Sequence, residues 1–417
     1  MKVSRQDIDL MAPVGSFETL HAAIQGGADS VYFGIDRLNM RARSVYNFTP
    51  ADLQKIVRYS KSFNKRTYLT LNVVVYDNEM PRMKEILDRA KEKGIDAVIA
   101  SDQAVIQYCQ TIGMEVHLST QLNISNLETL AFYSAYADVA VLARELDLKQ
   151  VAAMADQIKR QHIKGPSGKL IKLEMFIHGA LCMSLSGKCY LSLHHYNQSA
   201  NRGACLQDCR RAYTVREKET GLELDVENEY IMSPKDLCTI HFLDKILAAG
   251  VRVLKIEGRA RSPEYVKTVT SCYNEAINSI VEGSYSAERK EAWKERLNSV
   301  FNRGFWDGYY LGQKMGEWSD VHGSKASKRK VYVARNLNYF HKLGVGEFLC
   351  EADTVRVGDE ILIIGPNTGV IETEISEIHN DAGPVNEVVP GERFAIKLPK
   401  KVRRADKLYK RVKEPES

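Results

Sequence analysis

The sequence predicts an α/β fold: a TIM-type (β/α)8 barrel with a long Cys-rich insertion before its last strand, then a small C-terminal antiparallel β-barrel. Three observations predict it. A helix-then-strand pattern recurs through roughly the first 260 residues, it supplies eight short apolar runs, and short alternating strands replace it from Val331 onwards. Helices that alternate with buried strands are typical of α/β folds, and eight such units close a barrel. A long open sheet is the alternative.

The repeating unit is clearest at residues 24–34, 91–101, 134–144 and 247–258, where a helical segment ends in a small residue and a β-branched run follows. Glycine fits the left-handed position that closes a helix, and runs that are apolar on both faces are typical of parallel strands. The predicted strands are 8–14, 30–35, 67–75, 97–101, 115–120, 138–143, 172–178 and 251–257. The last barrel helix is predicted around 263–282.

Polar residues recur where these strands end, and in a barrel the active site lies at that face. They either line a cavity or belong to exposed loops. The set is Asn72, Asp102, His117, Ser119, Gln121, Arg144, Glu145, His178, Lys255, Glu257 and Arg259.

The seventh and eighth strands are separated by about seventy residues, far more than a usual βα loop. We therefore place an insertion at about 182–250 within a barrel domain at 1–318. A linker at 319–330 leads to the β-domain at 331–417. The insertion holds five of the eight cysteines, namely Cys182, Cys189, Cys205, Cys209 and Cys238. The other three, Cys109, Cys272 and Cys350, are predicted to be core residues.

Clustered cysteines in a reducing compartment favour a metal site or catalysis over disulfides. No Cys-x2-Cys pair occurs, and Ala212 stands where a Cys-x3-Cys-x2-Cys motif after Cys205 needs its third thiol. The wide spacing suits a 4Fe–4S cluster, although zinc and plain burial stay open. A cysteine nucleophile also stays open, because His178, His194 and His195 lie near Cys182 in sequence. The chain has neither a His-Glu-x-x-His nor a Gly-x-Ser-x-Gly motif.

The bulk composition is that of an ordinary globular protein, with 44% hydrophobic and 27% charged residues. No apolar run approaches the roughly 18 residues of a membrane span, and the polar N-terminus does not resemble a signal peptide. We therefore expect a cytoplasmic protein without a membrane partner. The net charge is only +5, but the segment 398–413 is densely basic. It is either a solvated terminus or a nucleic-acid-binding surface.

The run EMFIHGALCMSLSGKCYLS at 174–192 resembles the signature of the collagenase-like peptidases, family thirty-two of unknown catalytic type. Similar blocks lie at 12–34, 202–213, 254–266 and 301–312, so the resemblance spans most of the chain. Despite the family name, its well-understood branches resemble iron–sulfur proteins for oxygen-independent hydroxylation of tRNA uridine, ribosomal RNA cytidine or a ubiquinone precursor. The quinone branch generally lacks a terminal β-domain. The resemblance therefore implies prephenate-dependent conversion of the tRNA wobble uridine to 5-hydroxyuridine.

The resemblance also implies partners and ligands. It implies tRNA and the iron–sulfur assembly machinery as partners, prephenate as a co-substrate, and a 4Fe–4S cluster. The implied cluster ligands are Cys182, Cys189, Cys205 and Cys238, with Cys209 as the alternate. A collagenase-like peptidase, a ribosomal RNA hydroxylase and a non-enzymatic RNA-binding metalloprotein are the alternatives.

Prephenate carries two carboxylates, which guanidinium groups bind in bidentate fashion. The predicted catalytic residues are Arg144, Lys255, Glu257 and Arg259. The predicted substrate-binding residues are Arg41, Arg43, Asn72, Gln121 and His178. Alternatively, Arg144 pairs with Glu145, and Arg259 with Glu257, around the rim. Asp102 and Glu257 are candidate proton-transfer groups.

Overall fold

The computed structural model describes residues 3–42, 47–216, 218–221, 223–224, 232–320 and 323–414. Eight parallel strands form a closed barrel, because β11 pairs with both β1 and β7. They are β1 (Asp9–Pro13), β2 (Ser30–Gly34), β3 (Arg66–Leu71), β4 (Ala97–Ala100), β5 (Glu115–Leu118), β6 (Val139–Val141), β7 (Lys172–Gly179) and β11 (Val253–Ile256). All eight predicted strands are confirmed, and the open sheet is excluded.

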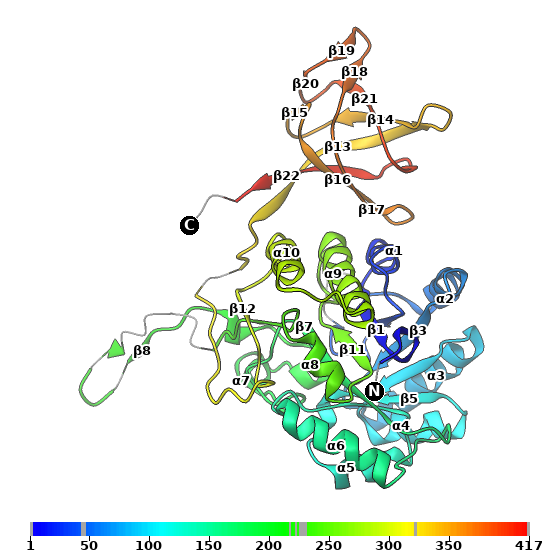
Figure 1. The fold of residues 1–417 in the computed structure, drawn as a ribbon, viewed down its shortest axis with the longest axis vertical. Helices are drawn as coiled ribbons and strands as arrows, with labels where there is room; N and C mark the ends of the chain where they lie inside the picture. Colours follow the sequence, from blue (N-terminus) through cyan, green and yellow to red (C-terminus); the bar gives the residue numbers. More distant parts are fainter. Residues whose placement is uncertain are drawn as a thin grey trace.

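Helices surround the barrel (Figure 1) and bury their apolar faces against it. They are α1 (Phe17–Gln25), α2 (Leu53–Ser62), α3 (Met80–Lys93), α4 (Gln103–Thr111), α5 (Leu127–Ser134), α6 (Leu148–Arg160), α8 (Leu243–Ala248), α9 (Pro263–Glu282) and α10 (Ala287–Asn298). The 3-10 turns are η1 (Arg5–Asp7), η2 (Pro50–Asp52), η3 (Asp77–Glu79), η4 (Thr120–Leu122), η5 (Ala200–Arg202) and η6 (Asp208–Arg210). Helix α9 matches the last predicted barrel helix. None of the helices in the described residues is long and apolar enough to cross a membrane.

The insertion between β7 and α8 leaves the barrel and then returns to it. Its elements are α7 (Leu191–Tyr196), β8 (Val215–Arg216), β9 (Glu223–Leu224) and β10 (Asp236–Cys238). Strand β10 pairs antiparallel with the end of β7, opposite His178, and β12 (Phe305–Trp306) pairs with β10. The insertion therefore adds β10 to the barrel sheet beside β7, and β12 extends that edge, which the apolar pattern did not predict.

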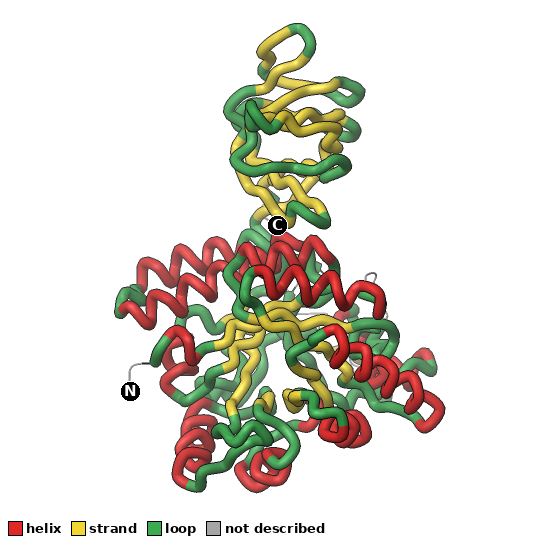
Figure 2. Tube along the Cα trace, turned by 90° about the vertical axis from the view of Figure 1, so that its right-hand side faces the viewer, coloured by secondary structure: helices red, strands yellow, loops and turns green. Residues whose placement is uncertain are grey.

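The C-terminal module is an antiparallel β-structure with its own apolar core (Figure 2), as expected. Its strands are β13 (Lys328–Phe340), β14 (Val345–Cys350), β15 (Val355–Arg356), β16 (Glu360–Gly365), β17 (Gly369–Glu374), β18 (Ile378–Asn380), β19 (Gly383–Val385), β20 (Glu387–Val388), β21 (Arg393–Lys397) and β22 (Lys407–Lys413). Strand β13 begins at Lys328, within the segment expected to be a linker.

Helix α1 joins the module to the barrel mouth. At its end, Gln25 donates to the carbonyl of Thr368 (2.9 Å) and accepts from the amide of Val370 (3.0 Å). Gly369 permits this approach, because a Cβ there would stand 2.5 Å from Gln25 Oε1 and its φ is +71°. Just before α1, a Cβ on Gly15 would stand 2.2 Å from the carbonyl oxygen of Arg259. The segment from Gly15 to Gln25 therefore links the carboxyl ends of the barrel strands to the β-module.

Candidate active site

A cavity of about 350 Å³ lies at the carboxyl ends of the barrel strands. Most of the predicted site residues line it. From the barrel these are Arg41, Asn72, Gln121, Arg144, Lys255, Glu257 and Arg259. From the insertion they are Cys182, Cys189, Cys205 and Cys209. The predicted ligand Arg43 lies outside the described residues.

The fourth cysteine at the cavity is Cys209, not Cys238 as the resemblance implied. Cys238 lies on β10, is only 3% exposed, and its Sγ is 4.0 Å from the hydroxyl of Tyr273 on α9. Because β10 extends the sheet beside β7, the Cys238 side chain is buried between the sheet and α9. Cys209 instead follows Cys205 in the same loop and reaches the cavity with it.

Cys182 and Cys205 lie close enough to Cys189 and Cys209 to affect the pKa of the latter two thiols. Burial raises the pKa of Cys209 to about 11, and Cys182, Cys205 and Cys189 add to the rise while Arg210 opposes it. Burial also raises the pKa of Cys189, again with contributions from Cys182 and Cys205. Within the described part of the chain, however, no three His, Cys, Asp or Glu side chains are close enough to hold a metal ion. The thiols therefore fit a 4Fe–4S cluster in number and donor type. In this structure, however, they lie farther apart than the ligands of one metal ion would.

Glu257 is paired with Arg41 rather than with Arg259. Arg41 Nη2 lies 2.9 Å from Glu257 Oε1. Burial alone would raise the pKa of Glu257, but Arg41, Arg261 and Arg144 outweigh it and lower that pKa. The carboxylate is therefore ionised at neutral pH and is suited to holding cations at the cavity.

Arg259 is directed across the cavity floor by neutral partners. Its Nη1 donates to Thr70 Oγ1 (2.6 Å) and to Asn39 Oδ1 (3.2 Å). Burial lowers the pKa of Arg259 to about 10. With no carboxylate among these partners, the charge of Arg259 is left for an anionic ligand.

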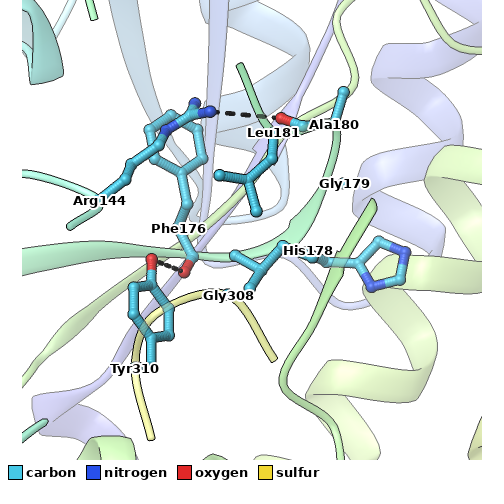
Figure 3. Close-up of a pocket in the computed structure, with 9 residues that line it drawn as sticks. Arg144, Phe176, His178, Gly179, Ala180, Leu181, Gly308 and Tyr310 are labelled. Atoms are coloured by element: carbon cyan, nitrogen blue, oxygen red, sulfur yellow. Dashed lines mark hydrogen bonds between the residues drawn. The ribbon is translucent and has the colours of Figure 1, made fainter. Parts of the chain in front are cut away.

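Arg144 stacks on Phe176 beside the cavity (Figure 3), its guanidinium carbon 4.2 Å from the ring centroid. It donates to the carbonyl of Ala180 at 3.3 Å, and its buried Nε has no hydrogen-bond partner in the described structure. The hydroxyl of Tyr310 fixes the same strand by donating to the carbonyl of Phe176. Arg144 is therefore held in place, and its Nε remains able to donate a hydrogen bond.

Lys255 is the cavity end of a charged chain inside the barrel, where branched apolar side chains are usual. Lys255 Nζ lies 2.7 Å from Glu174 Oε1. His117 follows, 3.4 Å from Glu174 and 3.4 Å from Glu115. Burial lowers the pKa of Lys255 against the attraction of Glu174. Burial would raise the pKa of Glu174, but Lys255 and His117 outweigh it and lower that pKa.

Asn72, Ser119 and Gln121 form a small polar network on the cavity wall. Asn72 Nδ2 donates to Ser119 Oγ at 3.3 Å and to Gln121 Oε1 at 3.5 Å. The Ser119 hydroxyl also donates to Gln121 Oε1. With its oxygen occupied in this way, the Gln121 amide nitrogen is the group left to donate to a ligand.

His178 does not reach the cavity, contrary to its predicted role in substrate binding. It is buried beside Tyr273, and its Nδ1 lies 3.4 Å from that hydroxyl. Burial, helped by Arg261, lowers the pKa of His178 to about 3. It borders the small neighbouring cavity of about 10 Å³ shown in Figure 3.

Asp102 and Glu145 are also not among the residues that line the cavity. Asp102 caps α4, accepting from the amides of Ala104 (2.9 Å) and Val75 (3.0 Å), and Glu145 is exposed.

Three arginines at the cavity were missed. Arg210, Arg261 and Arg303 line it, and the last two lie 4.0 Å and 3.5 Å from the buried carboxylate of Asp236. Their sequence signal was weak, because each lies outside a predicted strand end. Arg261 stands two residues after Arg259, and Arg210 follows Cys209 directly. They add positive charge to the side of the cavity that faces the insertion.

Comparison with known proteins places this architecture in a family. A Porphyromonas gingivalis protein named collagenase is 56% identical over 98% of this chain and 99% of its own length. A tRNA hydroxylation protein of Bacillus subtilis is 30% identical over 94% of this chain and 92% of its own. A 23S rRNA 5-hydroxycytidine synthase of Escherichia coli is 30% identical over 76% of this chain and 47% of its own. Residues 15–320, the barrel with its insertion, match Peptidase family U32, and the chain belongs to that family.

Proposed function

We propose that this protein is an iron–sulfur enzyme that hydroxylates a pyrimidine of RNA. The specific proposal is conversion of the tRNA wobble uridine to 5-hydroxyuridine with prephenate as co-substrate. The observation that carries it is the composition of one cavity, whose wall combines four cysteine thiols with buried and half-buried cationic groups. The relatives named for tRNA and ribosomal RNA hydroxylation support the same chemistry.

The cluster would be held by Cys182, Cys189, Cys205 and Cys209, with the iron–sulfur assembly machinery as the partner that supplies it. Thiolates are the ligands that such clusters require, and the bound cluster would supply electron transfer. Cys189 and Cys209 are half-buried, whereas Cys182 and Cys205 are exposed. The part of the cavity wall that these four cysteines form, here called the thiol wall, is therefore open to solvent.

The cationic groups suit a small dicarboxylate. Within the described residues, Arg144 has an unsatisfied Nε and the hydrogen-bond partners of Arg259 are neutral. Lys255 adds a buried ammonium. Carboxylates bound to guanidinium groups in a dry cavity form strong, directional hydrogen bonds. Glu257, ionised and 2.9 Å from Arg41, would hold that guanidinium at the same site.

The test is mass spectrometry of tRNA nucleosides from a strain that lacks the gene and any redundant pathway. We expect 5-hydroxyuridine and its derivatives to disappear, to return with the wild-type gene, and not to return with Cys182→Ser. Unchanged 5-hydroxyuridine in the deletion strain would overturn the tRNA assignment. Loss of a ribosomal hydroxycytidine instead would move the proposal to ribosomal RNA.

A peptidase is the second candidate, and the relative named collagenase favours it. A cysteine nucleophile needs a neighbouring base. The described contacts of the nearby histidines lead elsewhere, since His178 faces Tyr273 and His195 lies 3.5 Å from Asp208. Gelatin hydrolysis by iron-free protein, abolished by Cys182→Ser, would favour the peptidase over the hydroxylase.

A further inference from the structure

The insertion places an exposed apolar ledge on the wall of the cavity. Met183, Leu185 and Tyr190 all line the cavity, yet they are 45%, 55% and 67% exposed. Large apolar side chains that stay open to water in a cavity mark a binding surface rather than a core. They come from the same short loop as Cys182 and Cys189, so the ledge adjoins the thiol wall.

The ledge is fixed over the polar network of Asn72, Ser119 and Gln121. The side-chain Nδ2 of Asn123 donates to the carbonyl of Ser186 at 2.9 Å. Gly187 lies against Gln121, since a Cβ at that position would stand 2.8 Å from Gln121 Cβ, and its φ of +73° also favours glycine. The loop is therefore anchored at its centre, with the apolar side chains on both sides of the anchor.

The cavity is thus amphipathic, and each part matches a different part of one ligand. The ledge offers apolar surface and an aromatic ring, and Gln121 offers a hydrogen bond to a planar edge. Arg210, Arg261 and Arg303 offer positive charge. A nucleotide within RNA has a flat apolar face, a hydrogen-bonding edge and an anionic phosphate. Proteins that read single-stranded RNA stack its bases on aromatic side chains in this way.

We propose that Tyr190, with Met183 and Leu185, is the stacking platform for a single unpaired pyrimidine of RNA. The side-chain amide nitrogen of Gln121 then donates to the edge of that base. This inference rests on the proposed function and extends it by assigning the base to a named wall of the cavity. Stacking on this ledge brings the base beside the thiol wall and requires the nucleotide to be unpaired, as in a hairpin loop.

The test is equilibrium binding of two fluorescein-labelled RNA hairpins, one with uridine in its loop and one with an abasic ribose at that position. Wild-type protein should bind the uridine hairpin about five- to hundredfold more tightly, the range expected for one stacked base. Tyr190→Ala should lose this preference while binding the abasic hairpin as wild type does. Tyr190→Phe should keep it, because the ring is retained.

Phe132 on α5 supplies the matched control, since it is 64% exposed and does not line the cavity. Phe132→Ala should leave both affinities unchanged. Equal weakening of both hairpins by Tyr190→Ala would overturn the platform, and so would no change in either. Loss of the uridine preference on adding prephenate would mean that the ledge receives the prephenate ring instead. If the deletion strain loses 5-hydroxyuridine but Tyr190→Ala keeps the preference, this inference fails while the proposed function stands.

Discussion

Lys255 and Glu174 form an ion pair inside the barrel, with 2.7 Å between Nζ and Oε1 and both side chains at most 5% exposed. Removing one partner leaves the other charge buried and unpaired. We predict that Glu174→Gln lowers the free energy of unfolding by about 3–5 kcal/mol, measured by urea denaturation. The double variant Glu174→Gln with Lys255→Met should recover part of that loss. Simple addition of the two single effects would contradict a coupled pair.

The carboxylate of Glu257 should make stability depend on pH. Its pKa in the folded protein is lowered below the ordinary 4.5, so the unfolded chain takes up the proton first as the pH falls. Glu257 therefore stabilises the protein above about pH 4.5, and this contribution is lost as the pH falls through the lower folded pKa. We predict that the stability difference between wild type and Glu257→Gln is larger at pH 7 than at pH 4. A difference that grows in acid would refute this, and the exposed Glu145→Gln supplies the baseline.

Cys209 and Cys238 should behave differently in iron binding. We predict that Cys209→Ser removes most of the iron and the absorbance near ~400 nm after anaerobic purification. Cys238→Ser should retain both, because its thiol is buried away from the cavity against Tyr273. Iron analysis and the visible spectrum measure the effect, and circular dichroism checks the fold. The reverse pattern would restore the ligand set that the resemblance implied.

Arg259 should contribute directly to binding of a dicarboxylate. We predict that Arg259→Gln weakens prephenate binding about 10- to 100-fold in calorimetric titration, the range for a hydrogen bond to a charged group. Arg160 on α6 is exposed and outside the cavity, so Arg160→Gln should leave the affinity unchanged. Identical affinities of wild type and Arg259→Gln would remove Arg259 from the binding site.

The basic C-terminal segment divides into paired and outward-facing charges. Lys410 and Arg411 pair with Asp353 and Glu372. The turn before β22 is held by Asp406, which accepts from the amide of Arg403 at 2.8 Å. The exposed cations of the segment include Lys401, Arg403 and Arg404, which lie in and beside this turn.

We predict that Lys401→Glu, Arg403→Glu and Arg404→Glu together weaken tRNA binding. The slope of log affinity against log salt should fall by about 2–3, roughly one phosphate contact for each cation. The control carries the same charge change on α6, which lies across the barrel from α1 (Figure 1), as Lys149→Glu, Lys159→Glu and Arg160→Glu. Equal effects of both triple variants would mean that the turn affects tRNA binding only through the net charge of the protein.

The strands of the barrel could be predicted because each is a short apolar run buried on both faces, and that signal is local. The fourth cavity thiol could not, because it depends on β10 pairing with β7, which only the folded chain reveals. The same holds for Lys255 and Glu174, which meet because their strands are neighbours across the closure of the barrel. Tyr190 has no distinguishing sequence signal beyond its place after Cys189.

Helix α1 links the cavity end of the barrel to the β-module. It spans nine residues, about 14 Å. Gly15, just before the helix, packs against the carbonyl of Arg259, and the last residue, Gln25, hydrogen-bonds to the β16–β17 turn. The spacing between the cavity and the β-module is therefore held by α1, together with Lys267 of α9, which pairs with Glu372 of β17. An RNA that contacts both would be selected by the distance from its reacting nucleotide to its distal phosphates, independently of its base sequence.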